Sequence, residues 1–146
     1  MSRVEHTVTV NRPAQVVFDY IADGTNNRGW RNGVLVIERT SAADGMGATY
    51  RQVTNTGPGG TRLKEDYRVT VFDPPRRLEF LITAGPVRPI GVFELAENPD
   101  LSTRVRFSLD VKPTGFMKLL TPTLTKRMQR EVDALDNLKA ILERAS

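Results

Sequence analysis

The sequence contains no cysteine among its 146 residues, and it has a single histidine and a single tryptophan. The absence of cysteine excludes disulfides, thiolate metal sites and a cysteine nucleophile. With one histidine and no carboxylate cluster at ligand spacing, we expect neither a metal site nor a cofactor. A chain without disulfides also fits a cytoplasmic location, which is the one we expect.

Long hydrophobic runs are also missing. No stretch approaches the ~20 apolar residues of a membrane-spanning helix. The first ten residues, MSRVEHTVTV, alternate polar and apolar side chains and do not form a signal peptide. The net charge is +4, but the basic residues are spread along the chain and form no cluster. We therefore expect no integral membrane segment and no nucleic-acid partner.

The clearest pattern lies near the C-terminus. Between Pro122 and Arg144 apolar residues recur at steps of three and four, which predicts one amphipathic helix about 35 Å long. A separate short helical turn is expected for residues 115–120. The charged residues of this segment, Glu131 among them, are assigned to the polar face. The apolar stripe consists of Leu124, Met128, Val132, Leu135, Leu138 and Leu142.

Alternating polar and apolar residues predict about seven strands joined by short turns. Short turns imply antiparallel neighbours, and a sheet with one apolar face needs a cover. We predict an α+β fold in which a curved antiparallel sheet wraps around the long C-terminal helix, leaving a pocket between them. Residues 1–146 are expected to form a single domain, with two short helices within 13–30. The predicted strands cover residues 4–10, 34–39, 48–55, 61–72, 77–82, 90–96 and 104–111.

Three stretches carry a resemblance to a known family: VTVNRPAQVVFDYIAD at 8–23, NNRGW at 26–30 and NLKAILE at 137–143. With the order of elements, they resemble the START-like or Bet v 1-like superfamily and its helix-grip fold. Within it, the chain looks most like the bacterial polyketide cyclase/dehydrase and lipid-transport group, often labelled SRPBCC. The superfamily includes carriers of apolar ligands, cyclases, hydrolases, co-chaperones and quinone-binding proteins. Fold similarity therefore does not decide the function.

Three residues are candidates for moving a proton in such a pocket: Glu65, Tyr67 and His6. Glu65 shares strand parity with Tyr67, and an inward carboxyl would have a raised pKa and could act as a general acid or base. Alternatively, Glu65 lies near a strand end and reaches solvent, or pairs with an arginine. His6 shares parity with the neighbouring valines. It could transfer protons near neutral pH, or it could be exposed or hydrogen-bonded in the core.

Aromatic and aliphatic side chains supply the expected ligand contacts. The tyrosines and the tryptophan can stack on a flat ligand, although the tryptophan can equally be structural. The phenylalanines are expected in the wall or the core, and the three helix residues in the roof. The set consists of Trp30, Tyr50, Tyr67, Phe80, Phe93, Phe107, Leu124, Met128 and Leu135.

These observations lead to three functional hypotheses. The first is a protein that binds a small hydrophobic or aromatic, polyketide- or lipid-like ligand between sheet and helix. The second is a polyketide cyclase or dehydratase that folds its substrate and transfers a proton. The third is a protein-interaction module of the co-chaperone or toxin type. Either a monomer or a homodimer is compatible with the sequence.

Overall fold

The computed structural model describes residues 2–85, 87–111 and 121–145, and in that part of the chain eight strands form one antiparallel sheet. The strands are β1 (Ser2–Val10), β2 (Val34–Arg39), β3 (Thr49–Thr54), β4 (Leu63–Lys64), β5 (Tyr67–Asp73), β6 (Arg77–Ile82), β7 (Ile90–Glu97) and β8 (Thr103–Val111). Their order is β1-β8-β7-β6-β5-β3-β2, and β4 pairs with β3. The predicted curved antiparallel sheet is confirmed, with eight strands where about seven were expected.

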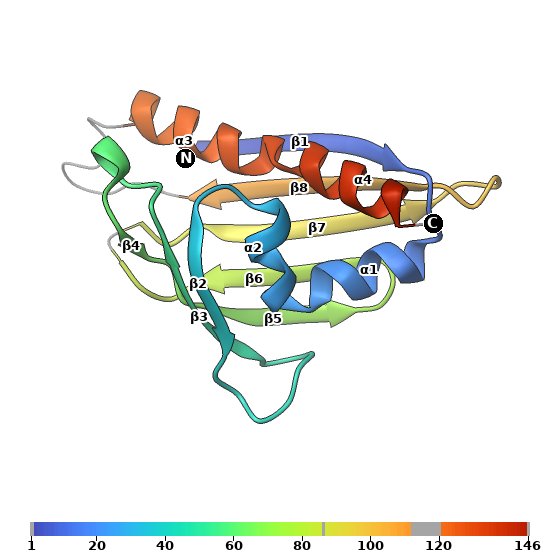
Figure 1. The fold of residues 1–146 in the computed structure, drawn as a ribbon, viewed down its shortest axis with the longest axis horizontal. Helices are drawn as coiled ribbons and strands as arrows, with labels where there is room; N and C mark the ends of the chain where they lie inside the picture. The colour runs from blue at the N-terminus through green and yellow to red at the C-terminus, as the bar shows by residue number, and fades with distance from the viewer. Residues whose placement is uncertain (1, 86, 112–120, 146) are drawn as a thin grey trace.

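The helices lie on one face of this sheet (Figure 1). The C-terminal pair, α3 (Thr121–Asp133) and α4 (Leu135–Arg144), runs end to end alongside β1 and β8. Between β1 and β2 lie α1 (Ala14–Ala22), the 3-10 turn η1 (Gly24–Asn26) and α2 (Asn27–Trp30). A second 3-10 turn, η2 (Pro58–Gly60), follows β3. This arrangement confirms the helix-grip fold, with two short helices between the first two strands.

The alternation of the strands decides which side chains meet the helices. On β8, Val105, Phe107 and Leu109 are buried beneath them, whereas Arg104 and Arg106 lie on the opposite face. Successive side chains of a strand point to opposite faces, so the pattern read from the sequence fixes the inner face of the sheet. The core therefore lies between that face and the helices.

The predicted long C-terminal helix is confirmed, with one tighter turn where α3 meets α4. The turn is at Ala134, which keeps right-handed helical dihedrals and whose N–H donates to the carbonyl of Glu131, three residues back, at 3.3 Å. Ala134 is itself buried, so the tighter turn faces the core. The two helices continue in one direction (Figure 1). The apolar residues of the stripe are buried in both of them. The short turn expected at 115–120 lies outside the described residues.

The predicted strand at 61–72 is also divided. Glu65 and Asp66 separate β4 from β5, although the N–H of Glu65 still donates to the carbonyl of Gln52 at 2.8 Å. The Asp66 carboxylate in turn accepts from the backbone N–H of Gln52 at 3.2 Å. The Asp66 carboxylate thus takes the place of a backbone carbonyl as the acceptor for the Gln52 N–H. The chain bends here, next to the space beneath α3.

Hydrogen bonds fasten α4 to the neighbouring end of β1. The Lys139 ammonium donates to the carbonyl of Thr9 at 2.6 Å, and the Arg12 guanidinium donates to the carbonyl of Leu142 at 3.0 Å. These contacts fix the C-terminal half of the helix pair against the sheet. The cavity described below lies instead under the first half, α3.

Candidate functional site

A cavity of about 250 Å³ lies between α3 and the sheet. It extends from the inner face of β6 and β8 to the segment around β4 and to the loop between β6 and β7. Its lining is mostly apolar, with a few charged side chains, as in pockets that bind small organic molecules. The main apolar side chains are Leu63, Phe80, Ile82, Leu109, Leu124 and Met128. The charged residues are Arg31, Lys64, Glu65, Arg127 and Glu131.

The position of the Phe80 ring in the cavity wall depends on a glycine on the neighbouring strand. Phe80 on β6 pairs with Gly91 on β7, and both belong to the inner face. A Cβ atom at position 91 would collide with the Phe80 ring, so the ring occupies the space that a side chain there would need. Phe80 is 3% exposed, so its ring would have to shift within the core to make room for a side chain at position 91. Gly91 therefore sets how far the Phe80 ring stands out from the sheet into the cavity.

A buried ion pair between Arg31 and Glu131 forms part of the cavity lining. The Arg31 guanidinium, just after α2, donates to the Glu131 carboxylate of α3 at 2.9 Å, and the two side chains are 5% and 11% exposed. The Arg31 Cζ also lies 5.8 Å from the centroid of the Phe80 ring and 5.9 Å from that of Phe107. An arginine stays charged even when buried, and the aromatic faces add to its stabilisation. The pair thus places a guanidinium, compensated by its carboxylate partner, beside the Phe80 and Phe107 rings.

Glu65 supplies a carboxyl group whose charge is not fixed. Burial raises the pKa of Glu65, and the nearby Glu131 carboxylate raises it further, while Arg31 and the Thr54 hydroxyl act in the opposite direction. Among the described residues, its Oε1 atom has no hydrogen-bond partner. The group therefore combines a raised pKa with a free acceptor or donor position at the cavity wall. This is the arrangement expected of a ligand anchor or a proton-transfer group.

We expect the Glu65→Gln variant to gain stability relative to the wild type as pH rises. The folded wild type holds the proton to a higher pH than the unfolded chain does, so its stability falls between the ordinary carboxyl pKa of 4.5 and the raised value in the fold. Glutamine has no proton to lose. Urea unfolding from pH 4 upward should show a difference that grows by at most about 1.4 kcal/mol per pH unit and then levels. A difference independent of pH would contradict the raised pKa.

The two tyrosines lie deeper than the cavity. Tyr50 and Tyr67 stack with ring centroids 4.9 Å apart, and neither lines the space beneath α3. The amide of Asn27 donates to the Tyr67 hydroxyl at 3.0 Å, and the N–H of Gly24 donates to that of Tyr50 at 3.3 Å. Burial raises the pKa of Tyr67, which keeps its hydroxyl protonated at neutral pH. The structure therefore places both tyrosines in a buried polar network. They do not line the cavity, where they were expected to contact a ligand.

Four other predicted ligand contacts also belong to the core and not to the cavity lining. Trp30 packs edge-on against Phe93 and Phe107, at centroid distances of 6.1 and 6.0 Å. Leu135 is fully buried at the start of α4, beyond the roof of the cavity. Of the predicted contacts, the structure brings three to the cavity: Phe80, Leu124 and Met128.

His6 lies at the sheet edge, between β1 and the C-terminal helices. Its Nε2 is 2.8 Å from the Asp136 carboxylate, and its Nδ1 is 3.5 Å from that of Asp133. The side chain is 30% exposed and does not line the cavity. The structure therefore separates His6 from Glu65, and of the three predicted proton-transfer residues only Glu65 reaches the cavity.

Sequence reasoning missed the Arg31–Glu131 pair. Glu131 was assigned to the polar face, but it is buried and points inward. A signal was present: position 131 follows Met128 by three and precedes Leu135 by four, so it belongs to the apolar stripe. Arg31 had no comparable signal, since it stands 100 residues away in an irregular segment.

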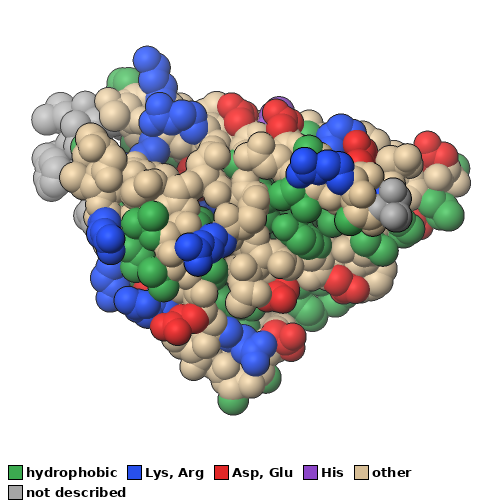
Figure 2. All heavy atoms as spheres, in the orientation of Figure 1, with side chains coloured by type: hydrophobic (Ala, Val, Ile, Leu, Met, Phe, Trp, Pro, Cys, Tyr) green, Lys and Arg blue, Asp and Glu red, His purple; other side chains and the backbone are tan. Residues whose placement is uncertain are grey.

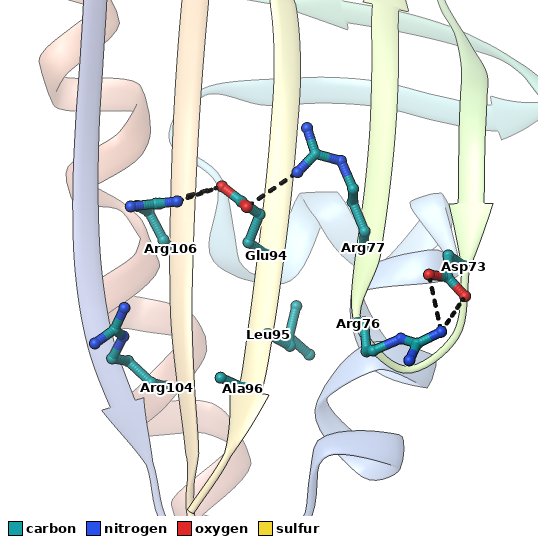
Figure 3. Close-up of a pocket in the computed structure, with 8 residues that line it drawn as sticks. All are labelled: Asp73, Arg76, Arg77, Glu94, Leu95, Ala96, Arg104 and Arg106. Carbon is teal, nitrogen blue, oxygen red and sulfur yellow. Dashed lines mark hydrogen bonds and ion pairs between the residues drawn. The ribbon is translucent and has the colours of Figure 1, made fainter.

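A second hollow, of about 340 Å³, lies on the outer face of the sheet (Figure 3). Its arginines largely neutralise acidic neighbours: Glu94 bridges Arg106 at 2.6 Å and Arg77 at 3.0 Å. Arg76 likewise pairs with Asp73 at 3.3 Å. Paired surface charges of this kind are an ordinary feature of a solvated sheet. The cavity under α3 is therefore the better candidate for a functional site.

Neither a membrane helix nor a metal site emerges from the residues that the structure describes. No helix there is long and apolar enough to cross a bilayer. Nor do those residues contain a group of three or more histidine, cysteine, aspartate or glutamate side chains placed to hold a metal ion.

Solved structures show the same fold at low sequence identity. TTHA0849 from Thermus thermophilus is 21% identical, with 99% of each chain covered and a TM-score of 0.82. The ZhuI aromatase/cyclase from Streptomyces sp. R1128 is 20% identical, with 97% of this chain and 93% of that chain covered and a TM-score of 0.80. A START superfamily protein from Mycobacterium smegmatis is 15% identical over the full length of both chains, with a TM-score of 0.80.

The sequence comparisons extend this likeness from fold to family. No curated protein matches the sequence. The pattern of one family, described as polyketide cyclase / dehydrase and lipid transport, matches residues 1–143. This match confirms the resemblance inferred from the three sequence stretches, and because it spans nearly the whole chain, the protein belongs to the polyketide cyclase/dehydrase and lipid transport family.

Proposed function

We propose that the protein binds a small hydrophobic or aromatic ligand in the cavity beneath α3. The observation that carries this proposal is the cavity itself: an apolar space with one unpaired carboxyl position, at Glu65. Its volume of about 250 Å³ lies just below the range of roughly 300–1,000 Å³ common for ligand pockets. The ligand is therefore compact, with a few rings at most inside the cavity and a polar group that hydrogen-bonds Glu65.

The direct test is native mass spectrometry of freshly purified protein, combined with titration of phenylnaphthylamine, an uncharged fluorescent probe. A co-purifying organic molecule, or saturable one-to-one probe binding, supports the proposal. Protein without a bound molecule that also fails to bind the probe contradicts it.

We expect Met128→Trp to weaken phenylnaphthylamine binding by at least about tenfold, because the larger side chain fills a cavity that the ring system would occupy. Met128 is 3% exposed and lines the cavity from α3. The matched control is Val16→Trp, which adds an indole at a position 46% exposed on α1. Equal affinities for the two variants, both folded by circular dichroism, would mean that the probe binds elsewhere.

A second candidate function is catalysis of the cyclase or dehydratase type. It is favoured by the raised pKa of Glu65, which suits a general acid or base at a wall of the cavity. The 20%-identical aromatase/cyclase shares the fold and supports this candidate only by analogy. Incubation with an aromatic polyketide precursor, followed by mass spectrometry, separates the two functions. Loss of water from the precursor, dependent on Glu65, supports a dehydrating catalyst, and recovery of unchanged bound precursor supports a carrier.

A further inference from the structure

A groove of about 680 Å³ adjoins the cavity at its outer end. It runs between the loop that contains η2 and the first half of α3. The groove and the cavity share three lining residues, Pro58, Arg127 and Glu131. The two spaces therefore meet at these three side chains, and a ligand that occupies both has to reach past them.

The groove differs from the cavity in its chemistry. Its lining includes the glycines of segment 56–60, with the polar side chains of Asn32, Asn55 and Thr123. Two arginines, Arg127 and Arg130, stand on its helical side. The cavity offers an apolar surface, whereas the groove offers hydrogen-bonding groups and positive charge.

Neither groove arginine forms an ion pair with another described residue, and Glu131 is already paired with Arg31 at 2.9 Å. The Arg127 charge does act on the Glu65 carboxyl, whose pKa burial raises and Arg127 lowers in part, whereas Arg130 is not among the principal causes of that shift. Figure 2 shows lysine and arginine side chains gathered at the end of the molecule where α3 begins, with apolar side chains among them. The contrast with the outer face is clear, because there each acidic residue of the hollow pairs with an arginine (Figure 3).

We propose that the ligand is amphipathic, with an apolar ring portion in the cavity and an oxyanion in the groove that Arg127 and Arg130 bind. Arginine forks match the geometry of carboxylate, sulfonate and phosphate oxygens, and charge-assisted hydrogen bonds are the stronger kind. The two arginines are three positions apart on α3, so they share a helix face and can converge on one anion. This inference rests on the proposed binding function and adds the chemical class of the ligand.

The test compares two probes that differ chiefly in one anionic group: phenylnaphthylamine, which is uncharged, and anilinonaphthalene sulfonate. We expect Arg127→Gln/Arg130→Gln to weaken sulfonate binding by about tenfold or more, since two charge-assisted hydrogen bonds are lost. Arg130→Gln alone should weaken sulfonate binding by about threefold or more and leave binding of the uncharged probe within about twofold, because Arg130 lines the groove and not the cavity. The affinity of the wild type for the sulfonate should also fall as salt rises.

Lys126→Gln is the matched control, because it removes an exposed charge from the same helix without lining either space. The inference is overturned if this control weakens sulfonate binding as much as the double arginine variant does, or if Arg130→Gln weakens both probes equally. It is also overturned if inorganic phosphate and the sulfonate bind together without competing. If the wild type binds neither probe and carries no co-purifying molecule, the proposed binding function itself fails, so the two failures are distinguishable.

Discussion

Glu131→Gln is expected to lower the free energy of unfolding by about 3 kcal/mol at neutral pH, because it leaves the buried Arg31 guanidinium without its charged partner. The loss should lie at the low end of the range for broken buried pairs. Glu65 is close enough to act electrostatically on Arg31, and removal of the Glu131 charge removes one cause of its raised pKa. In the variant Glu65 can then ionise and compensate in part. Urea unfolding followed by circular dichroism measures the effect.

The control is the double variant Arg31→Met/Glu131→Met, which removes both charges and keeps much of the volume. Replacing a whole buried pair by apolar residues is often neutral, so this protein should stay within about 1 kcal/mol of the wild type. A Glu131→Gln variant that loses less than about 1 kcal/mol would show that solvent screens the pair. If the double variant is as unstable as the single one, the loss comes from packing and not from the unpaired charge.

Leu135→Ala should cost about 2–5 kcal/mol of stability and leave phenylnaphthylamine affinity unchanged. Leu135 has no exposed surface and lies outside the cavity lining, so its truncation opens a new void in packed core. Leu124→Ala is the comparison, since Leu124 lines the cavity from the same apolar stripe. Its truncation enlarges a space that already exists, and it should alter probe affinity while costing less stability.

Urea unfolding and fluorescence titration of both alanine variants check this division of the stripe. The two leucines were expected to share one role as roof, so the experiment separates the roof from the core. If Leu135→Ala changes probe affinity as strongly as Leu124→Ala does, the cavity extends further along the helices than the structure indicates.

Much of the fold could be predicted because it depends on local periodicity. Period-two alternation on β8 identified the inward residues, and steps of three and four on α3 and α4 identified the buried stripe. The tighter turn at Ala134 could not be predicted, since the sequence has neither proline nor glycine there and the stripe continues through it.

The candidate site was predictable only where it follows strand or helix parity. Phe80 and Met128 were placed on inward faces, because each shares a face with apolar neighbours. For Glu65 the strand parity allowed an inward side chain, but its place near a strand end left a solvent-exposed position open as well. The same parity rule also selected Tyr67 and His6, which face inward but lie deeper or at the edge. Parity gives the face of a residue and not its position along the cavity. That position depends on pairing between distant segments, as does the Arg31–Glu131 pair.

Gly91 influences the size of the ligand that the cavity can accept. The residue lies beneath the Phe80 ring, away from the roof and the mouth, and does not itself line the cavity. An added methyl group there would push the ring outward, shortening the space available to a ligand while leaving its charged groups in place. One substitution behind the wall could thus shift selection toward smaller ligands without altering a single contacting side chain. The size of the ligand proposed for this cavity therefore depends also on a position that the ligand does not touch.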